Sequence, residues 1–128
     1  MTTTTHRRRL ATGALLMSFA LLVTAAPVSA KVRLGHCSGS TDWAMDVYIE
    51  DGRIESELEV DHSHSGDHWD WTMKNDGHPF ASGHSTIASG HDSFVVVRFS
   101  TNGPGSDTIV SRAVNRATGE VCQGSITL

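Results

Sequence analysis

Positive charge is scarce in this sequence beyond its first thirty residues. Three of its ten lysines and arginines, Arg7, Arg8 and Arg9, lie in that stretch, which leaves seven basic residues against 14 acidic ones. The resulting net charge of −7 offers no basic patch that could follow a phosphate backbone or an anionic membrane surface. We therefore expect neither nucleic acid nor a membrane as a partner of the folded part.

Long apolar runs and helical periodicity are also missing beyond the N-terminus. The N-terminal stretch follows its arginines with mostly apolar residues 10–23 and ends in the small residues Val28-Ser29-Ala30. This order is typical of a secretory signal peptide, and the apolar run is shorter than the roughly 18 residues of a spanning helix. We predict a signal peptide over residues 1–30, one domain over residues 31–128, and a secreted, extracellular protein.

Cysteine occurs only twice, as Cys37 and Cys122. In an exported domain of this size, an even number of cysteines indicates a disulfide. The bridge would close a loop of 85 residues, which a chain-entropy account values at roughly 4–5 kcal/mol. We predict that it ties the first strand of the fold to the last.

Alternating apolar and polar residues are the main pattern that is present. Between Arg53 and Met73, the apolar Ile54, Leu58 and Val60 share one parity and glutamates fill the other. Successive strand side chains point to opposite faces, so this alternation predicts a half-buried strand with an acidic outer face. Further strands are predicted over residues 31–39, 42–50, 68–74, 80–87, 93–100, 107–115 and 121–128.

These short strands, with turns between them, predict an all-β fold, an antiparallel β-sandwich of about seven strands, with a small closed barrel as the alternative. One consistent pairing is a hairpin that turns at Ser65-Gly66 and sets Val60 opposite Trp71. A loop crossing between sheets would use the same residues. Residues 93–100 are apolar on both parities, which predicts a central strand, whereas residues 80–87 predict an edge strand or irregular structure.

The C-terminal segment carries a pattern that extends to two earlier segments. It comprises Asp107-x-Ile109-x-x-x-Ala113-x-Asn115-x-x-Thr118-Gly119-Glu120-x-Cys122, together with Ser38-Gly39-Ser40-x-Asp42-Trp43 and Gly66-x-x-Trp69. These residues resemble a group of short secreted actinobacterial proteins of unassigned activity. The resemblance covers most of residues 31–128 and implies a single Ig-like β-sandwich domain. Its pattern contains no catalytic motif, so it implies nothing about chemistry.

Histidine is the one residue type that suggests a metal site. Seven of the eight histidines lie beyond residue 30, and the densest cluster includes His62, His64 and His68. An H-x-H pair on a strand directs both imidazoles to one face, so these residues and Asp67 are candidate ligands of zinc or copper. A solvated polar turn explains the same cluster, because no C-x-x-C or H-E-x-x-H motif accompanies it.

Catalysis has little support in the sequence. Gly83-His84-Ser85 begins like a nucleophile elbow, but Ile87 stands where the closing glycine belongs. The tryptophans at positions 43, 69 and 71 share the apolar parity of their strands, which predicts core packing and not a carbohydrate platform.

We therefore predict a monomeric extracellular module with a binding or accessory role, no enzymatic activity and an unknown partner. Weak zinc or copper binding through the histidine turn is the alternative function. A hydrolase or a hydrolase inhibitor is the third.

Overall fold

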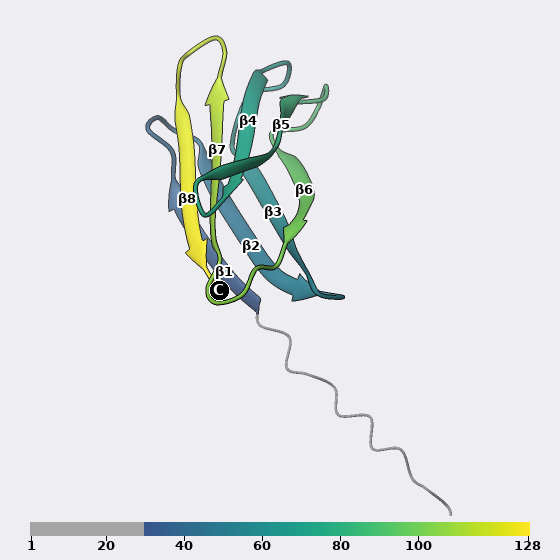
Figure 1. Cartoon of the computed structure of the whole chain (residues 1–128). Helices are drawn as coiled ribbons and strands as arrows, with labels where there is room; N and C mark the ends of the chain where they lie inside the picture. The colour runs from purple at the N-terminus through teal and green to yellow at the C-terminus, as the bar shows by residue number, and fades with distance from the viewer. Residues whose placement is uncertain (1–29) are drawn as a thin grey trace, which may run out of the picture.

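The structure, a computed structural model, describes residues 30–128 as two antiparallel sheets packed face to face (Figure 1). The strands are β1 Ala30–His36, β2 Asp42–Glu50, β3 Arg53–Asp61, β4 His68–Asn75, β5 His78–Thr86, β6 Phe94–Thr101, β7 Thr108–Asn115 and β8 Val121–Thr127. The predicted β-sandwich is confirmed, with eight strands where about seven were expected. The predicted signal peptide lies outside the described residues, apart from Ala30. Within residues 30–128, no helix has the length and apolar character that crossing a membrane requires.

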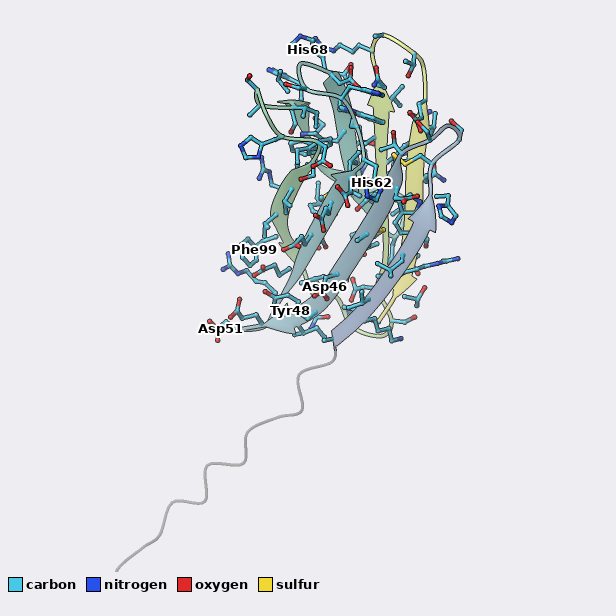
Figure 2. All side chains as sticks on the ribbon, turned by 180° about the vertical axis from the view of Figure 1, so that it is seen from behind. Asp46, Tyr48, Asp51, His62, His68 and Phe99 are labelled. Atoms are coloured by element: carbon cyan, nitrogen blue, oxygen red, sulfur yellow. A yellow bond between two sulfur atoms is a disulfide. The ribbon has the colours of Figure 1, made fainter. Side chains whose placement is uncertain are left out.

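One sheet contains β1, β2, β3 and β6 in that order, and we call it the front sheet because it faces the viewer in Figure 2. Every second side chain of β2 and β3 is buried, as the period-two pattern requires. In β3 the buried positions are Ile54, Ser56, Leu58 and Val60, and the glutamates between them lie on the outer surface. The predicted half-buried strand with an acidic outer face is confirmed.

The back sheet contains β5, β4, β7 and β8 in that order. Strand β4 buries Trp69, Trp71 and Met73 against the front sheet, and β2 contributes Trp43 from the other side. All three indoles are at most 7% exposed, so the prediction that they pack in the core is confirmed.

The predicted hairpin at Ser65-Gly66 is wrong. Strand β3 lies between β2 and β6, and β4 lies between β5 and β7, so residues 62–67 carry the chain from the front sheet to the back sheet. Val60 pairs with Trp43 and Phe94 instead of Trp71. The crossing lets the apolar faces of β3 and β4 cover each other across the core, which a hairpin within one sheet would not do.

The predicted central position of residues 93–100 is also wrong. Strand β6 is an edge strand that pairs with β3, and its outward side chains Val95 and Phe99 are 51% and 42% exposed. At the other edge of this sheet, Val32 and Leu34 of β1 point outward as well and are 65% and 73% exposed. The edge position expected for residues 80–87 is confirmed by β5.

The two sheets are fastened where β1 lies against β8, and we call this side the closed seam. The predicted disulfide joins Cys37 to Cys122 there. Lys31 Nζ and Arg33 Nη1 each donate to a carbonyl oxygen of β8, at 2.5 and 2.9 Å. The Trp43 ring lies against glycines of both strands, Gly35 of β1 and Gly124 of β8, where any Cβ would overlap with it.

On the opposite side β5 lies near β6, and we call this side the open seam. Here the Trp71 ring is covered by the guanidinium of Arg98, whose Cζ lies 4.8 Å from the ring centroid. A hollow of about 490 Å³ lies beside it, lined by Pro79, Phe80, Ala81, Ser82 and Arg98. Within residues 30–128, neither a disulfide nor an ion pair joins β5 to β6 across this seam.

Candidate functional site

The four predicted metal ligands lie close in sequence but do not converge. His62 turns back over the front sheet, where its Nδ1 lies 3.1 Å from Asp42 Oδ2. His64 extends into solvent, with its Nδ1 3.8 Å from Asp67 Oδ2. His68 lies on the outer face of β4, where its Nδ1 meets Thr86 Oγ1 at 2.8 Å. Among residues 30–128, no three His, Cys, Asp or Glu side chains are arranged to hold a metal ion.

Asp67 has a structural role in the crossing between the sheets. Its Oδ2 accepts hydrogen bonds from Ser63 Oγ at 2.9 Å, Asn115 Nδ2 at 3.0 Å and the His64 N–H at 3.2 Å. Partial burial acts to raise the pKa of Asp67, but these three hydrogen bonds together lower it. Ser63 Oγ also accepts from Trp69 Nε1 at 3.0 Å. The carboxylate therefore anchors the turn to β7 and, through Ser63, to the core.

The residues of the elbow-like motif are also separated from one another. Ser85 Oγ accepts a hydrogen bond from Trp71 Nε1 at 3.2 Å. His84 is its neighbour in β5 and therefore points to the opposite face of the strand. His84 lies across from Asp70, which forms a two-pronged ion pair with Arg116 at 2.6 and 2.9 Å. These side chains stabilise the back sheet and form no nucleophile–base pair.

Acidic side chains gather instead on the outer surface of the front sheet, which we call the acidic face. Seven of the 14 acidic residues in the chain project from it. They are Asp42, Asp46, Glu50, Glu55, Glu57, Glu59 and Asp61. Among lysines and arginines of the described residues, Arg53 alone shares this face, and its guanidinium lies over the Phe99 ring at 4.5 Å.

Apolar side chains flank the acidic rows on both sides. In the register of β3 with β6, Glu55 lies beside Phe99, Glu57 beside Val97 and Glu59 beside Val95. Figure 2 shows Asp46 and Tyr48 of β2 and Phe99 of β6, with His62 toward one end of the sheet and His68 beyond it. The acidic face therefore combines an excess of negative charge with exposed apolar surface.

The titration of nearby groups reflects the concentrated negative charge. A hydrogen bond with Glu55, together with desolvation and the neighbouring Glu50 and Asp46, raises the pKa of Tyr48 to about 12. The pKa of Glu50 is also raised, mainly by its hydrogen bond with Glu55. Both shifts mean that additional negative charge is disfavoured here, and a cation would be favoured by the same field.

A hollow of about 530 Å³ opens on the acidic face beside the closed seam. Its apolar wall includes Leu34 and Ala44, and its polar wall includes Glu59 and Asp61. Asp42 lies between two imidazoles, because His36 Nδ1 approaches Oδ1 at 2.5 Å and His62 Nδ1 approaches Oδ2 at 3.1 Å.

The contact between Asp42 and His62 shifts the pKa values of these two groups toward their charged forms. Hydrogen bonds with His36 and then His62 lower the pKa of Asp42. The hydrogen bond with Asp42, followed by the charge of Asp61, raises the pKa of His62. Sequence reasoning found His62 but missed His36 and Asp42, which only become neighbours when β1 and β2 pair.

Comparison of the chain with models of protein families finds no match, and comparison with curated proteins finds none. The geometry of the acidic face and of the two seams therefore carries the functional argument.

Proposed function

We propose that this protein is a secreted, non-catalytic binding module with an Ig-like β-sandwich. Its outer front-sheet surface, the acidic face, receives a partner that carries basic side chains. The observation that carries this proposal is the gathering of seven carboxylates around a single arginine on one sheet surface. Charge of this kind steers oppositely charged partners and selects among them.

The apolar flanks of the acidic face favour a partner that is amphipathic as well as basic. Leu34 is 73% exposed at one edge of the sheet, and Val95 and Phe99 are about half exposed at the other. Exposed apolar groups beside charged ones are common where protein surfaces meet, because the apolar core supplies burial and the charges fix the register. A protein or peptide segment with lysine or arginine beside apolar residues matches both features.

The alternatives have less support from the described side chains. Metal binding through the histidine turn would require His62, His64, Asp67 and His68 to converge, and their present contacts hold them apart. A hydrolytic role would require Ser85 to face a base, and its hydroxyl is engaged by Trp71.

Titration with short oligolysine, followed by NMR shifts of the backbone amides, tests the proposal. We expect the shifts to map to β2, β3 and β6, and the binding to weaken as salt rises from about 50 to 500 mM. The triple variant Glu55→Gln/Glu57→Gln/Glu59→Gln is expected to bind about tenfold or more weakly, since it removes the central row of carboxylates.

A matched control distinguishes this surface from net charge. Asp51→Asn/Asp76→Asn/Asp92→Asn changes the net charge by the same amount but lies in turns and loops. Asp51 and Asp76 have positive φ values of 49° and 48°, which asparagine also tolerates. Oligolysine binding that the two triple variants reduce equally would contradict the proposal.

A further inference from the structure

Strand β6 has the composition of a central strand but the position of an edge strand. Its sequence FVVVRFST places apolar residues on both faces, a pattern typical of strands with neighbours on both sides. Yet β6 pairs with β3 alone, and Val95 is 51% exposed. Among residues 30–128, strand β6 therefore combines an unpaired edge with exposed apolar side chains.

The other edge strands in residues 30–128 carry devices that block such pairing. Strand β1 directs Lys31 and Arg33 across to β8, so these side chains occupy β8 carbonyls and cover both edges. Strand β5 contains Pro79 at a register shift in its pairing with β4. Inward charges, prolines and bulges are the usual protections of edges.

Strand β6 has one of these protections, the inward charge of Arg98, and lacks the other two. It pairs with β3 over eight consecutive residues without a register shift, and it contains neither lysine nor proline. Its one charge, Arg98, folds over Trp71, and the Nη1 of Arg98 donates to the carbonyl of the adjacent Val97 at 2.7 Å. This carbonyl therefore lies on the free side of β6, and by the antiparallel alternation so do the backbone groups of Val95 and Phe99.

Space for inward side chains exists beside this edge. The open-seam hollow of about 490 Å³ lies next to Arg98 and is walled by Pro79, Phe80 and Ala81. A strand added to β6 would direct every second side chain toward this hollow. The side chains of Pro79, Phe80 and Ala81 and the repulsion by the Arg98 guanidinium favour apolar side chains there over cationic ones.

The outward side chains of an added strand would meet a different environment. They would lie beside Val95, Val97 and Phe99 of β6. Two strand spacings, each about 4.8 Å, would separate them from the glutamates of β3, which are Glu55, Glu57 and Glu59. Lysine and arginine are long enough to extend over the valines toward these carboxylates. A second copy of this chain would instead bring two acidic faces together, each on a chain with twice as many acidic as basic residues beyond residue 30.

We propose that β6 docks an extended segment of a partner protein as an antiparallel fifth strand of the front sheet. In this segment, basic side chains face outward and alternate with apolar ones that face the open seam. The inference rests on the proposed function, because it takes the partner to be cationic, and it adds how that partner is held. Main-chain hydrogen bonds supply affinity in this mode, and alternate side chains supply specificity.

The probe for this mode is a capped octapeptide of alternating lysine and valine, compared with two versions methylated on backbone nitrogen. Since the free backbone groups of β6 belong to outward-facing residues, the lysine N–H groups of the antiparallel peptide face β6. Methylation at the lysine nitrogens is expected to weaken binding by about tenfold or more, and methylation at the valine nitrogens to leave it nearly unchanged.

The outcomes separate the docking mode from the proposed function. Equal binding of all three peptides would overturn docking at β6 while leaving the proposed binding of a cationic partner to the acidic face in place. No binding of the unmethylated peptide, together with no oligolysine binding, would overturn both. A stable dimer of the protein that Val95→Lys abolishes would show that a second copy occupies the edge, and it would overturn the choice of a cationic partner.

Discussion

A tryptophan ring lies at each seam of the sandwich, and the two seams differ in what covers that ring. At the closed seam, the Trp43 ring lies between Gly35 and Gly124, and the disulfide is nearby. At the open seam, the Trp71 ring is covered by the side chain of Arg98. The comparison shows that the covalent link between the sheets lies at the closed seam, whereas β4 and β6 are joined by non-covalent contacts such as that from Asn75 Nδ2 to Thr101 O at 3.1 Å.

The largest expected difference between the seams comes from the disulfide. Cys37→Ala/Cys122→Ala opens a loop of 85 residues and is expected to lower the free energy of unfolding by about 4 kcal/mol. Arg98→Leu at the open seam is expected to lower it by less than about 1 kcal/mol, because it removes one exposed cation–π contact. Guanidinium unfolding curves measure both, and similar losses for the two variants would contradict the contrast.

A matched pair of glycine substitutions gives an intermediate effect. A Cβ on Gly124 would overlap with the Trp43 ring and with Met45 Sδ in the core, so Gly124→Ala is expected to cost about 1–3 kcal/mol. A Cβ on Gly83 would overlap with the Trp71 ring, whose outer cover is the exposed side chain of Arg98 and can move more easily than core atoms. We therefore expect a smaller fall in Tm for Gly83→Ala, and a larger one would show that the open seam is as rigid as the closed seam.

The smallest expected effect concerns Asp42 and His62. The pKa of Asp42 is lowered, so its contribution is present above its ordinary value of 3.8 and is lost on acidification. The pKa of His62 is raised, so its contribution is present below its ordinary value of 6.5 and is lost as pH rises through the folded pKa. The contact is therefore most stabilising between about pH 4 and 6.5.

His62→Asn tests this window, since asparagine also accepts the positive φ of 61° at this position. The difference in unfolding free energy between the protein and this variant is expected to be largest near pH 5–6 and to decrease as the pH rises through the folded pKa of His62. A difference that is constant from pH 5 to 9 would show that the imidazole charge has no role.

Much of the fold was predictable because burial follows residue parity. The alternation in residues 42–50, 53–61 and 68–74 predicts both the strands and the side chains they bury, and the structure confirms both. The cysteine count predicts the disulfide. The positions of Cys37 and Cys122 in the sequence predict that it ties the first strand to the last.

The errors arose where parity does not carry the information. A hairpin and a crossing between sheets bury the same faces of β3 and β4, so Ser65-Gly66 could not decide between them. Apolar residues on both faces of β6 predict two neighbours, but a sequence cannot show that one of them is absent. The contact between His36 and Asp42 depends on the register of β1 with β2, which the intervening residues 37–41 alone do not fix.

Hydrogen–deuterium exchange of the β6 amides, with and without the lysine–valine octapeptide, tests the binding role of the open seam. We predict that the peptide slows exchange at Val95, Val97 and Phe99, whose N–H groups face the free edge, and leaves β1 and β8 unchanged. Bound peptide with no added protection in β6, or with its main protection at β1 and β8, would contradict the account.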